Sequence, residues 1–177
     1  MKKLSMDDLN RISVEDFQGS IKNPFVIVLD DIRSLNNVGS IFRNADAFLA
    51  EKIYLCGITG QPPHRDITKT ALGADESVAW EYAPDVLTLV TQLQTDNYFV
   101  LAIEQAEGSV FLQNFLPKPN QKYAFVLGNE VFGVNETVIE HCDGCLEIPQ
   151  FGTKHSLNVA VTSGIVMWEF VSKISKI

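Results

Sequence analysis

The chain has 177 residues, 46% of them apolar, and a formal net charge of −8, so it is long enough for one core and too acidic to bind nucleic acid through a broad basic field. No stretch reaches the roughly 20 apolar residues of a membrane helix, and no apolar run follows Lys2 and Lys3 as in a signal peptide. We therefore expect a cytoplasmic protein with a single domain over residues 1–177, in which residues 1–22 form a short helical lead-in.

The predicted elements alternate between helices and strands. Residues 7–11 form a short leading helix with Ser5 as its cap. The apolar run from Phe25 to Leu29 is typical of a strand buried on both faces, and apolar residues at helical spacing follow over 37–49. Further strands are expected over 52–56, 78–82, 98–103, 123–127 and 145–148, a loop over 57–65, and helices over 85–93, 135–141 and 156–172. This order predicts an α/β fold with a mostly parallel sheet flanked by helices.

The last predicted helix is apolar on two sides. One face holds Leu157, Ala160, Val161, Gly164, Ile165 and Trp168, and the other holds Val159, Val166, Met167 and Phe170. A helix with two apolar faces has to be covered on both of them. We therefore predict a homodimer that packs through this helix.

A loop with two glycines, Gly128 to Gly133, follows the predicted strand 123–127. The spacing of its glycines resembles a phosphate-binding P-loop, but the next residues are Val134 and Asn135 instead of a lysine and a hydroxyl residue. No Gly-x-Gly-x-x-Gly follows a predicted strand, so a Rossmann dinucleotide site is not supported either. The glycines alone could be ordinary turn residues. Glu130 lies between them, where ligands bind in parallel sheets.

Polar residues also open two of the predicted helices. Asn36 is suited to be the N-cap of the helix over 37–49, while Arg43, one turn inside it, could bind a phosphate through its planar fork. Ser156 is suited to cap the last helix, and the amide of Asn158 could face a ligand. His155 and Ser156 are adjacent, but no acidic partner or nucleophile elbow completes a hydrolase triad.

Three cysteines are too few for a disulfide framework. Cys142 and Cys145 have the spacing of half a metal site or a redox pair, with His141 beside them. There is no second pair of this kind, and Cys145 falls in a predicted strand. We interpret the cysteines as structural and expect no metal.

Taken together, three ordered motifs resemble the SpoU (TrmH-like) family of RNA 2′-O-ribose methyltransferases, of the SPOUT superfamily. They are Asn37-x-Gly39-x-x-x-Arg43, then Leu127-Gly-Asn-Glu130-x-x-Gly133, then Ile148-Pro-x-x-Gly152 followed by Ser156-Leu-Asn158. The resemblance covers residues 23–171. It implies a C-terminal trefoil knot, a dimer through the final helix, and S-adenosylmethionine as methyl donor.

The resemblance also implies site residues. Gly128, Ile148 and Leu157 are expected at the adenosine of the donor, in loops that include Leu127 and Gly133. The expected catalytic residues are Asn37, Arg43, Glu130, Ser156 and Asn158, with Arg43 serving the partner's site. Our hypothesis is that Arg43 binds the adjacent phosphate and stabilises the developing alkoxide. Ser156 and Asn158 would then position the ribose and the donor, and Glu130 would orient Arg43 or substrate hydroxyls.

With so acidic a chain, RNA has to be bound through local cations, for which we select Arg33, Arg65, Lys69 and Lys154. The sequence shows no long basic N-terminal extension of the kind some members carry, and we therefore expect tRNA as substrate rather than rRNA. Members often have methionine where Gln150 stands, so the methionine end of the donor pocket differs here. The alternative is a catalytically silent member that binds the donor or RNA without turnover.

Overall fold

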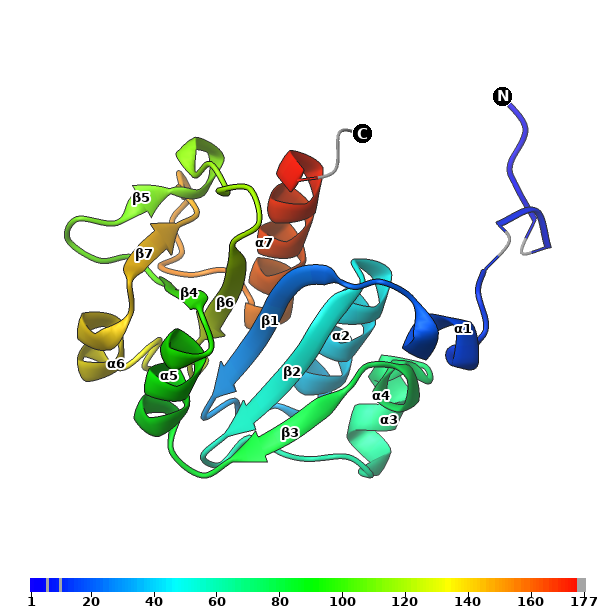
Figure 1. Cartoon of the computed structure of the whole chain (residues 1–177), viewed down its shortest axis with the longest axis horizontal. Coiled ribbons are helices and arrows are strands. Elements are labelled where there is room, and N and C mark those ends of the chain that lie inside the picture. Colours follow the sequence, from blue (N-terminus) through cyan, green and yellow to red (C-terminus); the bar gives the residue numbers. More distant parts are fainter. Residues whose placement is uncertain (6, 10, 175–177) are drawn as a thin grey trace.

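The computed structural model describes residues 1–5, 7–9 and 11–174. Its centre is a seven-stranded sheet in which every paired strand runs parallel to its neighbours (Figure 1). The strand order across the sheet is β3-β2-β1-β6-β4-β7-β5. The strands are β1 (Asn23–Asp30), β2 (Ala50–Cys56), β3 (Trp80–Ala83), β4 (Tyr98–Ile103), β5 (Val110–Phe111), β6 (Lys122–Leu127) and β7 (Gly144–Glu147). The predicted α/β class with a parallel sheet is confirmed.

Helices cover both faces of this sheet. They are the 3₁₀ turns η1 (Asp7–Leu9) and η2 (Leu112–Asn114), and the α-helices α1 (Val14–Gly19), α2 (Leu35–Ala47), α3 (Arg65–Ala71), α4 (Ala74–Ser77), α5 (Val86–Thr95), α6 (Glu136–His141) and α7 (Val159–Ile174). Helices α2 and α7 lie together on one face, and α5 and α6 lie on the other (Figure 1). Among the described helices, each is too short or too polar to cross a bilayer.

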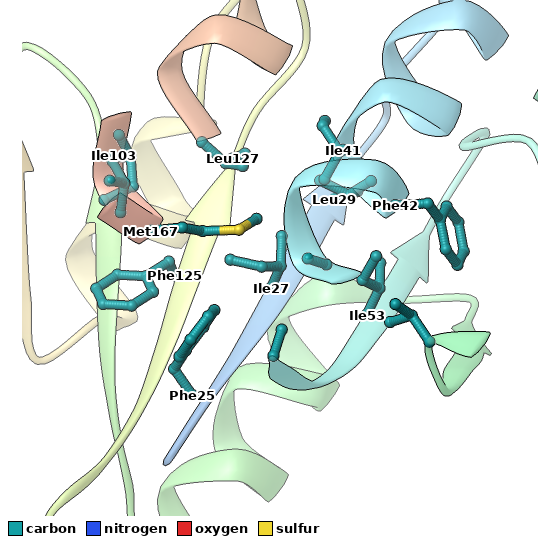
Figure 2. Packing of buried hydrophobic residues seen from close by; sticks show 14 of the residues in the cluster. Phe25, Ile27, Leu29, Ile41, Phe42, Ile53, Ile103, Phe125, Leu127 and Met167 are labelled. Carbon is teal, nitrogen blue, oxygen red and sulfur yellow. The ribbon is translucent and has the colours of Figure 1, made fainter. Parts of the chain in front are cut away.

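The hydrophobic core has two layers, and successive side chains of β1 point alternately into one layer and the other. Phe25, Ile27 and Leu29 point to the layer of α2 and α7, while Val26 and Val28 point to the layer of α5 and α6. On the first side, Phe170 of α7 meets Phe25 edge-on at 5.3 Å between ring centroids. Figure 2 shows Met167 of α7 beside Phe125 and Ile27 of the sheet. Burial of the central strands on both faces explains why they read as unbroken apolar runs.

Several predicted boundaries were wrong. Helix α2 begins at Leu35 and its cap is Ser34, whose hydroxyl accepts from the Asn37 amide, so Asn36 is not the N-cap. Helix α7 begins at Val159, and the cap predicted at Ser156 falls in the loop before it. Helices α3 and α4 were not predicted, and α1 was covered only by the helical lead-in expected over residues 1–22, because all three are short and bury too few residues to show a helical period.

The leading helix predicted over residues 7–11 is present only in part, as a 3₁₀ turn that does not include Arg11. Residues 7–9 form η1, and the Ser5 hydroxyl accepts from the Asp8 amide at 3.3 Å. Asn10, in the predicted range, lies outside the described residues.

Candidate functional site

A pocket of about 980 Å³ opens at the carboxyl ends of β1, β4, β6 and β7. Two loops form its lips, one over residues 128–135 after β6 and one over residues 148–157 after β7. The end of β4 supplies Glu104 and Gln105 between them. All five residues predicted for the donor line this pocket: Leu127, Gly128, Gly133, Ile148 and Leu157.

Glycine is needed at both ends of the first lip. A methyl group on Gly128 would collide with the backbone of Gly133 and Val134. Gly133 has φ of +69°, and a methyl group there would collide with the Glu104 carboxylate. The Gly133 amide donates to the Asn129 carbonyl at 2.8 Å, which closes the loop. The backbone therefore comes close to the pocket without side chains in between.

Glu130 ties this lip to the start of α2. One of its oxygens, Oε2, accepts from the Arg33 amide at 2.9 Å, and Oε1 accepts from the Ser34 amide and from Nδ2 of Asn37, both at 2.9 Å. Burial raises the pKa of the Glu130 carboxyl, but these hydrogen bonds outweigh it and leave the pKa below its ordinary value. Within its own chain, this carboxylate therefore bonds the start of α2.

Asn37 extends the same network to the second lip. Its Oδ1 accepts from Nδ2 of Asn158 at 3.1 Å. The Oδ1 of Asn158 accepts from the amides of Ala160 and Val161 at 2.9 and 3.3 Å, so Asn158 also caps α7. Three of the five predicted catalytic residues, Asn37, Glu130 and Asn158, are thus one chain of hydrogen bonds beside the pocket.

The other two predicted catalytic residues lie apart from this network. Ser156 lines the pocket with an exposed side chain. Arg43 is exposed on α2 and is not among the residues that line the pocket of its own chain. Its neighbour Asn44 fixes that part of α2 to α7, donating to the Ala160 carbonyl and the Ser163 hydroxyl at 2.9 Å each. Arg43 is therefore exposed on a helix that is itself fixed to α7.

The charge around the pocket has a clear pattern. Its described lining contains five carboxylates and no lysine or arginine: Asp30, Asp31, Glu104, Glu130 and Glu136. Burial, and then the nearby Asp31 and Asp85, raise the pKa of Asp30 to about 6. The predicted RNA-binding cations, Arg33, Arg65, Lys69 and Lys154, are all exposed and lie outside the lining. The carboxylates of the lining favour a cationic ligand in the interior of the pocket.

The sequence reading missed the two residues that join the lips. Glu104 accepts from the Val134 amide at 3.0 Å, and Gln105 donates from Nε2 to the His155 carbonyl at 2.7 Å. Both follow β4 directly. The rule that ligands bind at the carboxyl ends of parallel strands, applied to β6, would have found them had it also been applied to β4.

The cysteines lie away from the pocket lining. Cys142 is half-buried, and burial raises the pKa of its thiol to about 12. The Cys145 thiol donates to the Glu104 carbonyl at 3.3 Å. Within the described residues, no group of three or more histidine, cysteine or acidic side chains is placed to hold a metal ion.

Comparison with known proteins is consistent with this geometry. The model of the SpoU rRNA methylase family matches residues 24–168. The 23S rRNA (guanosine-2′-O-)-methyltransferases RlmB of Neisseria meningitidis serogroup B and of Escherichia coli K12 are 28% and 29% identical to this chain, over 90% of its length in both cases. The chain spans 63% and 65% of those relatives, less than two thirds of their length.

Two solved structures share the fold. An rRNA methyltransferase from Sinorhizobium meliloti with bound AdoMet superposes with a TM-score of 0.79 at 25% identity, covering 93% of this chain and 61% of that one. A TrmH/SpoU tRNA modifying enzyme from A. aeolicus gives a TM-score of 0.78 at 22% identity, covering 90% and 79%.

Proposed function

The chain belongs to the SpoU rRNA methylase family, and we propose that it is an S-adenosylmethionine-dependent RNA methyltransferase that modifies a ribose 2′-hydroxyl. One observation carries the proposal. Residues of the three motifs, which lie up to about 120 residues apart in the chain, meet beside one pocket, where Asn37 bonds both Glu130 and Asn158. The names of the RlmB relatives and the AdoMet-bound neighbour support the same activity.

The pocket fits this methyl donor. S-adenosylmethionine supplies a methyl group on a positively charged sulfur, and it also carries an ammonium group. The described lining offers carboxylates and no competing lysine or arginine, which favours a cation electrostatically. The close approach of Gly128 and Gly133 leaves backbone groups to bind a flat base. Gln150 lines the same pocket and gives it an amide where many members have a methionine.

The reaction moves a methyl group from sulfur to the ribose oxygen. The new O–C bond forms as the S–C bond breaks, the sulfur leaves as the neutral thioether S-adenosylhomocysteine, and the hydroxyl proton is released to water. The protein's contribution is alignment and stabilisation of the charge on that oxygen. We assign Arg43 to the phosphate next to the ribose and Ser156 to the ribose itself. Asn37, Glu130 and Asn158 are positioning residues, since their polar atoms are engaged with one another and with the starts of α2 and α7.

The substrate we propose is ribosomal RNA. Our sequence-based preference for tRNA has no support from the RlmB relatives, whose names specify 23S rRNA. Arg33, Arg65, Lys69 and Lys154 would supply the phosphate contacts, and these few cations predict binding that weakens steeply with salt. A ribosomal substrate implies action in the cytoplasm.

The proposed activity is tested by incubating the protein with tritiated S-adenosylmethionine and unmodified transcripts of 23S rRNA, 16S rRNA and tRNA. Label in a 2′-O-methylated nucleotide of rRNA is the expected result. Label in tRNA alone would restore the tRNA assignment. Donor binding without label in any RNA would mean that the chain is a silent member.

We further propose that the chain is one domain, knotted at its C-terminus and dimeric through α7. The face of α7 that includes Val161, Ile165 and Trp168 is exposed, at 52%, 37% and 55% of each residue's surface. The opposite face, with Val166, Met167 and Phe170, is buried against the sheet. A second copy would cover the exposed face and bring its Arg43 toward the pocket.

Mixing two inactive variants tests the shared site. Arg43→Ala lacks the arginine, and Asn158→Ala lacks a residue of the pocket. If Arg43 serves the partner, a heterodimer of the two has one intact site, and random exchange restores about one quarter of the wild-type rate. If the subunits exchange and the mixture stays inactive, Arg43 acts in the site of its own subunit.

A further inference from the structure

Two phenylalanines in the lips of the pocket are almost fully exposed. Phe132 belongs to the first lip and is 84% exposed, and Phe151 belongs to the second lip and is 95% exposed. Phe132 itself lines the pocket, and Phe151 directly follows Gln150, which also lines it. An aromatic ring this exposed gains nothing from its own fold, so a pair beside a binding site indicates a ligand surface.

The backbone that carries Phe132 is held firmly. The side chain of Asn129 accepts from the amides of Val131 and Phe132 at 2.9 and 3.2 Å, and its Nδ2 donates to the Asp31 carbonyl at 2.8 Å. The bonds of Glu130 to the start of α2 fix the same turn from the other side. Phe132 is therefore presented on an ordered support, which lowers the entropy cost of binding a ligand there.

Each lip also has an exposed cationic residue near its phenylalanine along the chain or across the lip's hydrogen bonds. The Arg33 amide bonds Glu130, next to Val131, which places Arg33 beside the first lip. Lys154 lies three residues after Phe151 on the second lip and is exposed. The flat face of a ring together with a nearby positive charge matches a nucleobase and its phosphate. A partner protein with an apolar surface would contact the two rings, but it would leave the charges of Arg33 and Lys154 without partners.

We propose that Phe132 and Phe151 stack on unpaired nucleobases of the RNA at the target nucleotide, and so make the protein select single-stranded RNA at its site. This inference rests on the proposed function and deepens it. In an A-form duplex the faces of the bases are covered by their neighbours, whereas loops and bulges expose them. Stacking on a ring tolerates any base, so the two phenylalanines select unpaired structure and not sequence.

The test compares single-stranded and duplex RNA. Fluorescence anisotropy measures binding of a labelled strand of about 20 nucleotides, alone and annealed to its complement, to wild type, Phe132→Ala and Phe151→Ala. Each variant should weaken single-strand binding by about 5-fold to 150-fold and leave duplex binding unchanged. Phe132→Trp should retain the wild-type preference. The matched control is Leu116→Ala, an apolar residue 77% exposed outside the lining of the pocket, which should change neither affinity.

Three results would overturn the inference. They are equal losses for single-stranded and duplex RNA, unchanged binding in both alanine variants, or a change in sedimentation that shows the rings to be covered by a second copy. Its failure differs from that of the proposed function. If the wild type methylates RNA and the alanine variants bind RNA normally, only the stacking inference is refuted. If RNA binding depends on the two rings but no methyl group is transferred, only the enzymatic proposal is refuted.

Discussion

The Glu130 carboxylate is the best place to test how the pocket is held together, because Glu130→Gln changes its charge and acceptors with little change in shape. The native side chain accepts three hydrogen bonds, from the amides of Arg33 and Ser34 and from Asn37. Glutamine keeps one oxygen as an acceptor, and its NH₂ group would face a donor. We expect the variant to fold but to be less stable.

The size of the loss follows from the contacts. A hydrogen bond to a charged group contributes about 1.5–3 kcal/mol when shielded, and the half-buried position of Glu130 reduces this to about 1 kcal/mol for the bond that is lost. Removing a negative charge from the N-terminus of α2 costs about 0.3–1 kcal/mol more. The free energy of unfolding should therefore fall by about 1–2 kcal/mol.

Urea unfolding at neutral pH measures this difference, with Glu136→Gln as the control. Glu136 is an exposed carboxylate of the same pocket and also lies in the first turn of a helix, so its replacement should cost about 0.5 kcal/mol or less. A loss for Glu130→Gln no larger than the control's would refute the view that this carboxylate joins the first lip to α2.

The pH dependence of the free energy of unfolding gives a second test, for which the direction of the change can be predicted. Because the folded state lowers the pKa of Glu130, its contribution to stability is fully present above the ordinary value of 4.5 and is lost as pH falls through the lower folded value. The stability difference between wild type and Glu130→Gln should therefore be constant near neutral pH and shrink in acid. A difference that stays the same down to the lowest pH at which both proteins fold would contradict a charged carboxylate.

Three further predictions concern the neighbouring residues. Arg43→Lys should lower methyl transfer at least about 10-fold at unchanged stability, because an exposed lysine cannot bind a phosphate bidentately; near-wild-type transfer would refute that role. Gly133→Ala should cost about 1–3 kcal/mol in urea unfolding and weaken donor binding in calorimetry, because of its positive φ and the nearby Glu104. Asn158→Ala should lose about 1 kcal/mol with the cap of α7, and a loss of donor affinity beyond that of Ser156→Ala would support its positioning role.

The central strands could be predicted from sequence because their burial is local information. The run Phe25–Leu29 is apolar throughout and lies inside β1, and the predicted strand over residues 98–103 coincides with β4. β5 could not be found in this way. It has two residues, both exposed, and it is a strand only because it pairs with β7, more than 30 residues away. Pairing of that kind leaves no periodic pattern in the sequence.

The candidate site shows the same contrast between features that are local in the sequence and features that depend on distant contacts. Motif spacing placed Glu130 at the pocket correctly, since it depends on the end of β6. It did not reveal the partners of Glu130 within the chain, because the amides that Glu130 binds lie 97 and 96 residues earlier and backbone groups have no signature in the sequence. Gln105 was missed for a similar reason, since its hydrogen bond ends on a carbonyl 50 residues later.

The hydrogen bonds also connect the pocket to α2, the helix that carries Arg43, although Arg43 does not line the pocket of its own chain. Glu130 of the first lip and Asn158 of the second both bond Asn37, which lies in the first turn of α2. Arg43 lies on the same helix, and Asn44 next to it is bonded to α7, whose exposed face is the proposed dimer contact. One helix therefore holds the hydrogen-bond network of a subunit's own pocket and also carries the arginine that we propose to serve the partner. In a dimer of this kind, a change that displaces α2, such as Glu130→Gln, would disturb alignment at both sites.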